Sequence, residues 1–351
     1  MPALGRSALL TASAIVALVA LVACSTGNSA GDPSTTAAIE PTIVTVTTSV
    51  ASTPATTSTS DSAGATTSAP VAPSSTDGTS TECVGPLTGP ETQQYRNDVG
   101  DVRADLVSID VYRRPGARDC PVLVWVHGGG WRSGDKAGKA IGTKVAFAGE
   151  MGAALVSVNY RLVTPDGDVR WPVMGEDVAA AVAWVVEHAE SLGIDPERVA
   201  LMGHSAGAHL VSIVATDPEL LTAAGASRDD VRCVVALDSA AYDITPTDAR
   251  TTPLFAAAFG VDPATLAGAS PTVQAREHPA GLPDVLVVTR GSPARVAEAD
   301  EFAATIRAGG ATGQLVDAGS YTHEQVNTEL GVLGEEVVTP PIRDLLRACW
   351  S

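Results

Sequence analysis

The stretch VALMGHSAGAHL, residues 199–210, changes pattern at a single residue. An apolar run of β-type residues ends at Gly203, and a helix-like apolar pattern follows Ser205. A G-x-S-x-G sequence between a strand and a helix is the pattern of a nucleophile elbow, a tight turn that exposes a serine hydroxyl. Gly203 and Gly207 suit that turn because side chains there would clash with the neighbouring backbone. The helix N-terminus beneath the serine would stabilise negative charge. We therefore expect Ser205 to be a nucleophile and not a serine that only caps the helix.

Apolar β-type runs alternate with longer helical patterns on both sides of this stretch. Such alternation predicts an α/β fold, a mainly parallel, doubly wound sheet with helices on both faces. Ligands in such sheets bind at the carboxyl ends of the strands. We expect the irregular segment 243–283, which is rich in Pro, Ala and Thr, to be a cap facing the substrate. The expected strands are 106–113, 121–127, 153–160, 198–203, 231–238, 284–290 and 313–318, and the expected helices are 136–150, 172–193, 205–216, 296–309 and 340–349.

Composition limits the class of protein. Residues 82–351 have the length of one large domain, and 45% of the whole chain is hydrophobic, enough for a sizeable core. The formal net charge of -18 argues against nucleic-acid binding, which needs a basic surface. It also argues against electrostatic attraction to anionic lipid.

The first residues are typical of export and not of a folded core. Arg6 precedes an apolar run at 8–23 that has the shape of a signal-peptide core. The sequence LVAC that ends at Cys24 resembles the lipobox of bacterial lipoproteins, so we expect a signal peptide at 1–23 and lipid on Cys24. Residues 24–81 are rich in Ser, Thr, Ala and Pro, and we expect a disordered tether there. These features predict an exported protein anchored to the outer face of a bacterial cell membrane. The alternative is an ordinary secretory signal with a chance cysteine.

Four of the five cysteines lie in the expected domain. In an exported protein they suggest two disulfides with three possible pairings, although the apolar neighbours of Cys233 could instead bury a free thiol. No cysteine or histidine spacing indicates zinc. The four are Cys83, Cys120, Cys233 and Cys349.

A second glycine motif precedes the elbow. The sequence VWVHGGGW, 124–131, ends a strand-like run with His127, three glycines and Trp131. Consecutive glycines let backbone N–H groups approach a ligand closely, as an anionic tetrahedral intermediate requires. This combination, with NYRL at 159–162, resembles the α/β-hydrolase superfamily, and within it the hormone-sensitive-lipase-like and bacterial feruloyl-esterase-like carboxylesterases.

The resemblance covers about residues 100–350 and implies roles for several positions. The oxyanion hole would be formed by the N–H groups of Gly129, Gly130 and Ala206. His127 would be structural and steady the loop. Trp131 would either wall the acyl pocket or serve only as a packing aromatic.

A serine hydroxyl needs a base, and the chain has six histidines. His323, in GSYTHEQVN at 319–327, follows the last strand-like run, where the resemblance places the base. We expect the side chain of His204 to point away from the nucleophile and His209 to be buried beneath it. Three candidates remain. They are His127 in the glycine loop, which is the HGGGW sequence at 127–131, His188 in a predicted helix, and His278 in the irregular segment.

The acid of the triad departs from the family pattern. The resemblance places it just beyond the strand at 284–290, but LVVTRGSPARVAEAD, 286–300, has no acid in that loop. We prefer Asp238, at the end of VRCVVALDSA, because pancreatic-type lipases take their acid from the strand after the nucleophile strand. Asp300 and Glu298 are alternatives that look helical and solvated, and a chain without a functional acid is a third. Asp177 and Asp243 are expected to be structural, and Asp317 is a minor candidate.

These motifs predict a serine hydrolase that cleaves carboxylic esters through an acyl-enzyme on Ser205, with no metal or organic cofactor. The short cap and an aromatic content of 4% favour small or medium acyl groups. Two alternatives keep the fold: an amidase of the formamidase type, whose relatives also carry HGGxW, and a surface-tethered binding protein that has lost catalysis.

Overall fold

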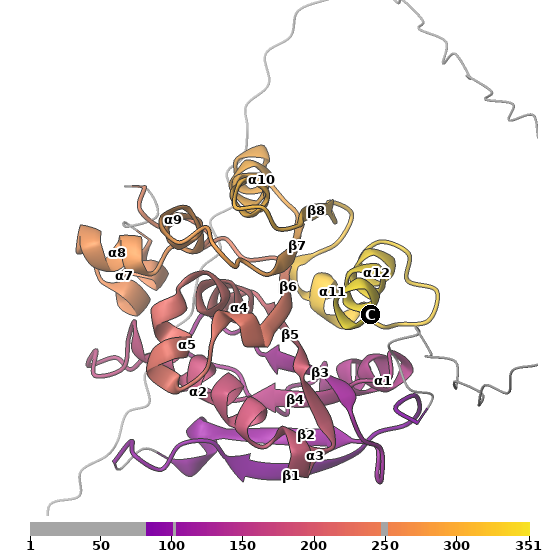
Figure 1. The fold of residues 1–351 in the computed structure, drawn as a ribbon. Helices are drawn as coiled ribbons and strands as arrows, with labels where there is room; N and C mark the ends of the chain where they lie inside the picture. Colours follow the sequence, from indigo (N-terminus) through magenta and orange to yellow (C-terminus); the bar gives the residue numbers. More distant parts are fainter. Residues whose placement is uncertain (1–81, 101–102, 247–251) are drawn as a thin grey trace, which may run out of the picture. The chain divides into compact units, whose positions relative to one another are not determined.

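The computed structural model describes residues 82–100, 103–246 and 252–351, so the predictions for 1–23, Cys24 and 24–81 lie outside the described residues. The described chain folds around one sheet with the strand order β1-β2-β4-β3-β5-β6-β7-β8 (Figure 1). Neighbouring strands from β4 to β8 run parallel, whereas β1 and β2 pair antiparallel at one edge. The prediction of a mainly parallel sheet is confirmed. The strands are β1 Thr88–Gln94, β2 Ser108–Arg113, β3 Cys120–Val126, β4 Ala154–Val158, β5 Ile194–His204, β6 Val231–Leu237, β7 Asp284–Thr289 and β8 Gly313–Asp317.

The central strands are buried on both faces, as their continuous apolar runs require. Every residue of β3 and β4 is buried, and so is every residue of β5 from Val199 to His204. The exposed β1 closes the sheet at one edge. The carboxyl ends of β3, β5 and β6 therefore lie side by side in the middle of the sheet.

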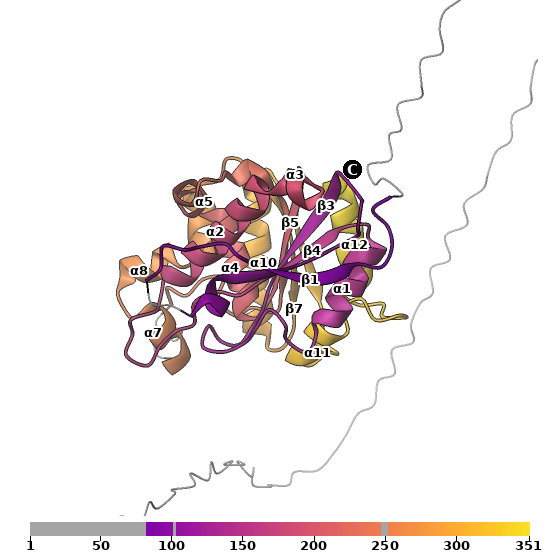
Figure 2. The same ribbon diagram turned by 90° about the horizontal axis from the view of Figure 1, so that it is seen from below.

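Helices cover both faces of the sheet (Figures 1 and 2). On one face α4 packs against β5 and β6, α2 packs on α4, and α10 covers β7 and β8. On the other face α12 crosses β5, β6 and β7, and α1 covers β4. The helices are α1 Ile141–Glu150, α2 Val173–Glu187, α3 Ala189–Leu192, α4 Ala206–Thr216, α5 Pro218–Ala224, α7 Pro253–Phe259, α8 Pro263–Gly268, α9 Pro271–Glu277, α10 Pro293–Ala308, α11 His323–Thr328 and α12 Thr339–Trp350, with short 3-10 turns at Ala104–Val107 and Arg228–Asp230.

The segment 243–283 is more regular than its composition predicts. It contains α7, α8 and α9, and each begins with a proline in its first turn, Pro253, Pro263 and Pro271. Proline is favourable there because the first turn has no intrahelical acceptor for its N–H. The prolines that we read as irregularity are helix starts.

Helix α1 begins at Ile141 and not at 136 because the preceding residues are held by the sheet. The backbone N–H of Lys136 donates to Asn159 Oδ1 at 2.6 Å, and its carbonyl accepts from the Ser157 hydroxyl at 2.7 Å. The ammonium of Lys136 pairs with Asp110 at 3.0 Å. These contacts to β2, to β4 and to the residue after β4 hold the segment in turns, so the helix begins only after them.

The four cysteines of the described chain form two disulfides, Cys83–Cys120 and Cys233–Cys349. The first ties the segment before β1 to the start of β3, and the second ties α12 to β6. A free buried thiol at Cys233, the alternative reading, is not what the structure contains. None of the helices in the described ranges combines the length and the apolar character needed to cross a bilayer.

Candidate active site

Ser205 lies between the end of β5 and the start of α4, at the turn that the motif predicts. Its backbone has φ 57° and ψ -117°, a conformation that non-glycine residues rarely adopt. The N–H of Ser205 donates to the carbonyl of Leu237 at 2.8 Å, which ties the turn to the end of β6. Strain of this kind persists only where the surrounding structure holds it, and it is common at functional sites.

The two motif glycines are required by close backbone contacts. A Cβ atom on Gly203 would lie 2.3 Å from the carbonyl oxygen of Gly207. A Cβ atom on Gly207 would lie 2.1 Å from the carbonyl oxygen of Val126 in β3. Both distances are far inside van der Waals contact, so β5 and α4 can approach β3 this closely only with glycine at these positions.

The glycine loop lies beside the serine. A Cβ atom on Gly128 would be 3.1 Å from the Cβ of Ser205. Gly129 and Gly130 have φ values of 117° and 60°, which glycine adopts at low cost. Within the described ranges the N–H groups of these two glycines donate to no acceptor, and Ala206 is the first residue of α4, where an N–H has no intrahelical partner. Three unpaired donors therefore flank Ser205.

His127 is part of the support of this loop. Its ring stacks on Tyr160 at 4.5 Å between centroids, and its Nδ1–H donates to the carbonyl of Gly128 at 2.8 Å. Burial lowers the pKa of His127, so the ring is neutral at physiological pH. These contacts are consistent with the structural role that the resemblance implies for His127.

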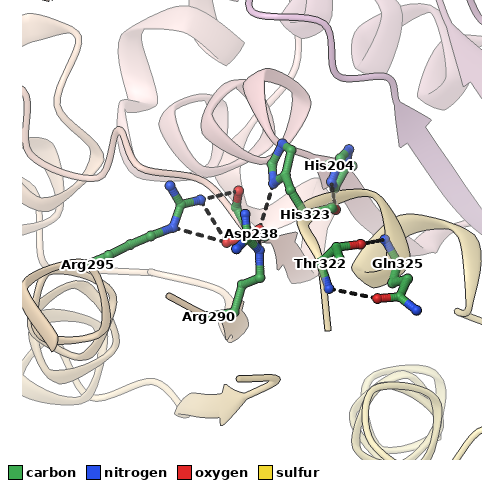
Figure 3. A network of polar contacts seen from close by, with 7 residues as sticks. All are labelled: His204, Asp238, Arg290, Arg295, Thr322, His323 and Gln325. Atoms are coloured by element: carbon green, nitrogen blue, oxygen red, sulfur yellow. Dashed lines mark hydrogen bonds and ion pairs between the residues drawn. The ribbon is translucent and has the colours of Figure 1, made fainter. Parts of the chain in front are cut away.

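His323 and Asp238 meet at the same end of the sheet (Figure 3). The Nδ1–H of His323 donates to Asp238 Oδ2 at 2.6 Å. His323 is the first residue of α11, which begins with a reciprocal capping box between Thr322 and Gln325. Asp238 follows the last residue of β6, is fully buried and has a φ of 54°. The structure thus brings together Ser205, His323 and Asp238, each from a separate strand end or loop.

Two arginines also bind the Asp238 carboxylate, and sequence reasoning did not identify them. Arg290 Nε donates to Oδ2 at 2.8 Å. Arg295 donates to Oδ1 through Nε at 3.1 Å and Nη2 at 2.7 Å, and Nη2 also reaches the Asp238 carbonyl at 2.8 Å. The signal was present in the loop after β7, where the resemblance implied an acid and TRGSPAR supplies two cations.

These contacts keep Asp238 ionised. Burial alone would raise the pKa of the carboxyl, but the hydrogen bond from His323 and the charge of Arg295 outweigh burial, and the pKa lies below its ordinary value. The carboxylate is therefore charged at neutral pH and can hold the His323 ring with Nδ1 protonated. That tautomer leaves Nε2 free to accept a proton.

The other candidate acids lie elsewhere. Glu298 Oε1 accepts the backbone N–H of Tyr242 at 2.9 Å, and Asp300 is exposed and pairs with Arg307 at 3.4 Å. Neither contacts His323 in the described structure. Asp177 is buried between Arg161 and Arg96, Asp243 accepts from Thr245, and Asp317 is the exposed last residue of β8.

The other two histidines near the elbow are buried and neutral. The His204 side chain, expected to point away from the nucleophile, contacts His323: its ring lies 4.5 Å from that of His323, and its Nε2–H donates to the His323 carbonyl at 2.9 Å. Burial and the neighbouring His323 lower the pKa of His204 to about 4. His209 is buried below the elbow as expected, with its Nε2–H on the Ala269 carbonyl at 2.8 Å. Burial also lowers the pKa of His209 to about 4.

Trp131 joins the glycine loop to the 243–283 segment. Its buried ring makes edge contacts with Phe255 and Phe259 of α7, at 5.6 and 4.9 Å between centroids. Leu254 Cδ1 is 3.1 Å from the point where a Cβ on Gly130 would lie. Helix α7 therefore packs directly over the glycine loop.

Metal ligation has no candidate in this part of the chain. Across the ranges that the structure describes, no group of three or more His, Cys, Asp or Glu side chains is arranged to hold an ion. The residues at the elbow can instead supply a nucleophile, a base and hydrogen-bond donors.

Comparison with known proteins agrees with this geometry. Residues 109–245 match the BD-FAE family model. A probable carboxylic ester hydrolase, LipM, of Mycobacterium tuberculosis is 37% identical over 31% of this chain and 25% of its own length. Carboxylesterase NlhH of the same organism is 38% identical over 36% of this chain and 39% of its own. The chain thus spans well under half the length of these curated relatives.

Solved structures extend the match beyond that segment. A hyperthermophilic esterase from Pyrobaculum calidifontis superposes with a TM-score of 0.55 and 26% identity, over 69% of this chain and 79% of that one. A thermostable esterase from Pseudomonas putida gives a TM-score of 0.57 at 23% identity, over 70% and 79%. The sheet order, the residues at the strand ends and these superpositions agree that the chain has the α/β-hydrolase fold.

Proposed function

We propose that the protein is a serine hydrolase that cleaves carboxylic esters through an acyl-enzyme on Ser205. One observation carries the proposal: a strained serine at the β5–α4 elbow stands at the strand ends where His323 Nδ1 meets a buried carboxylate at 2.6 Å. The relatives and structural neighbours described above are a carboxylic ester hydrolase, a carboxylesterase and esterases, which supports an ester over another acyl substrate.

Acylation follows from the protonation states. Ser205 Oγ attacks the ester carbonyl carbon while His323 Nε2 takes the hydroxyl proton. Asp238 stays ionised and stabilises the imidazolium that forms. The imidazolium then protonates the leaving alcohol oxygen as the C–O bond breaks.

The tetrahedral intermediate carries negative charge on the former carbonyl oxygen. In our proposal the N–H groups of Gly129, Gly130 and Ala206 donate to this oxygen. They are unpaired in the described structure and already oriented by the positive φ of the glycines and by the start of α4, so they need no reorganisation when the charge develops. In the second half-reaction, His323 deprotonates a water that attacks the acyl-enzyme, and Ser205 is regenerated.

Hydrolysis of p-nitrophenyl esters of increasing acyl length tests this proposal. We expect turnover by the wild-type protein and loss of about 10⁶-fold in kcat for Ser205→Ala, with folding retained. Ser212→Ala is the matched control because Ser212 is on the same helix and its hydroxyl only donates to the Ala208 carbonyl at 2.7 Å. Undiminished turnover by Ser205→Ala would contradict the mechanism.

Two measurements separate the alternatives. Faster hydrolysis of an amide than of its matched ester would identify an amidase. A wild-type protein that neither turns over esters nor is labelled at Ser205 by a fluorophosphonate probe would be a binding protein and would overturn the proposal.

We also propose that the protein is exported and anchored to the outer face of the cell membrane through lipid on Cys24. The support is the sequence alone: an apolar run at 8–23 behind Arg6, followed by LVAC and a Ser/Thr/Pro-rich segment. Firm anchoring needs two or more acyl chains, as a lipoprotein cysteine carries. Cell fractionation tests this: Cys24→Ser should appear in the soluble fraction, and a variant that stays with the membranes would refute the anchor.

A further inference from the structure

We propose that Arg290 and Arg295 are positioning residues for the base: together they clamp the Asp238 carboxylate in the orientation that holds His323, and they set the charge that His323 experiences. This inference rests on the proposed function. Both arginines act through Asp238, so the proposal does not require either of them to contact the substrate (Figure 3).

The clamp divides the two carboxylate oxygens between different partners. Oδ1 accepts hydrogen bonds from Nε and Nη2 of Arg295, at 3.1 and 2.7 Å. Oδ2 is shared by Arg290 Nε at 2.8 Å and His323 Nδ1 at 2.6 Å. A carboxylate held at both ends by planar guanidinium groups cannot rotate about its χ2 angle without losing charged hydrogen bonds. The lone pair that faces His323 is therefore fixed in direction.

Arg295 also stabilises the backbone that carries the acid. Asp238 has a φ of 54°, a left-handed conformation that is unfavourable for a residue with a side chain. Arg295 Nη2 donates to the Asp238 carbonyl at 2.8 Å while also binding Oδ1, so one guanidinium holds both the peptide and the side chain of this residue. That double contact acts together with the Asp238 N–H, which donates to the Val288 carbonyl at 2.8 Å, to fix Asp238 beyond the end of β6.

Burial makes these contacts stronger than an ordinary surface ion pair. The Asp238 side chain is 0% exposed, whereas those of Arg290 and Arg295 are 27% and 24% exposed. Loss of a hydrogen-bonded cation from a buried carboxylate has a larger effect than loss of an exposed pair. Each guanidinium group also contributes positive charge beside Asp238, so removal of either one changes the electrostatic surroundings of His323.

The charged and titratable groups around His323 come from several elements. They are Asp238 after β6, Arg290 after β7, Arg295 on α10, His204 at the end of β5, Glu324 on α11 and Lys144 on α1, whose ammonium donates to the Asn327 carbonyl. Variants of the two arginines keep all of these other side chains in the protein, so a difference between pH profiles arises from the loss of the arginine.

The test measures kcat, KM and the pH profile of kcat/KM on a short p-nitrophenyl ester for Arg290→Gln and Arg295→Gln. We expect kcat to fall by about 10- to 100-fold, the cost of a small misplacement of a catalytic group, with KM nearly unchanged. Loss of a nearby cation favours the imidazolium, so the acidic limb of the profile should move to higher pH by about one unit. Arg276→Gln is the control, because Arg276 forms an exposed pair with Glu301.

Arg295→Lys separates charge from geometry and serves if a glutamine variant fails to fold. It keeps the cation but loses the double contact, so kcat should fall while the acidic limb stays in place. A second, turnover-independent measurement is the ¹⁵N NMR signal of the His323 ring, assigned by comparison with His323→Ala. In the wild type at neutral pH it should report Nδ1–H alone, and in Arg295→Gln a mixture of tautomers.

A mutant cycle with Asp238→Asn decides whether the arginines act through the acid. Arg295→Gln should have no further effect on kcat in that background. An undiminished additional loss, or glutamine variants whose kcat, pH profile and NMR signal match Arg276→Gln, would overturn the clamp. An inactive wild-type protein would instead refute the proposed function, and the NMR comparison would still test the clamp.

Discussion

The two sides of the active site are built by different physics. On the nucleophile side, close backbone contacts determine which residues fit. Glycines at 203 and 207 are required because a Cβ atom there would lie 2.3 or 2.1 Å from a carbonyl oxygen. On the acid side, charge decides: a buried aspartate after β6 is held by His323, Arg290 and Arg295 from three separate segments. Steric requirements leave a short motif in the sequence, whereas a charge cluster leaves only scattered residues.

Replacement of Asp238, the centre of the acid side, should have a large effect on activity. Asp238→Asn leaves the shape of the site intact but lets His323 adopt the wrong tautomer, so kcat on a p-nitrophenyl ester should fall by about 10⁴-fold. Asp300→Asn and Glu298→Gln should keep most of the activity, because neither side chain contacts His323. If Asp238→Asn keeps a nearly normal kcat and one of these two variants is inactive, the acid has been assigned to the wrong residue.

The nucleophile side should respond through stability. Gly207→Ala forces a methyl group into the Val126 carbonyl, and we expect it to lower the free energy of unfolding by about 1–3 kcal/mol and to reduce activity by displacing Ser205. Gly142→Ala is the matched control, since no atom lies within 4 Å of the added Cβ on α1. Urea unfolding measures the free energy of unfolding of both variants. Equal stability of Gly207→Ala and the wild type would show that the elbow relaxes without cost.

The acid side also predicts a pH dependence of stability. The pKa of Asp238 is lower in the folded protein than its ordinary value of about 3.9, so the carboxylate stabilises the fold above that pH and loses this contribution as pH falls below it. As pH falls from about 5 to 3, Asp238→Asn should therefore lose less stability than the wild type. Thermal unfolding at several pH values measures the difference, with exposed Asp300→Asn as the control. If stability falls with pH equally in Asp238→Asn and the wild type, this prediction is wrong.

The same contrast explains what could be predicted from sequence. The strands that carry the site and the place of Ser205 follow from local patterns of apolar residues and glycine. The choice of His323 also needed the family resemblance. Asp238 could be preferred because it ends a strand whereas Glu298 and Asp300 look helical, but it is the contact with His323 in the structure that separates them. Arg290 and Arg295 were not identified because their function depends on a partner more than fifty residues away, at separations of 52 and 57. The direction of His204 depends in the same way on the carbonyl of His323, 119 residues later.

Helix α7 of the 243–283 segment, the expected cap, packs over the glycine loop, and a change there should show the smallest effect. Leu254, partly buried on α7, lies against Gly130 of the glycine loop, so its side chain limits the space next to the proposed oxyanion donors. Leu254→Ala removes three carbon atoms there and should shift the preference in kcat/KM towards longer acyl chains by a few-fold to about tenfold, since each methylene group contributes about 0.8 kcal/mol of transfer free energy. Leu333→Ala, at a fully exposed leucine, is the control. An unchanged acyl-length profile for Leu254→Ala would mean that the acyl chain leaves the glycine loop on the side away from α7, and the cap would then have no part in choosing the substrate.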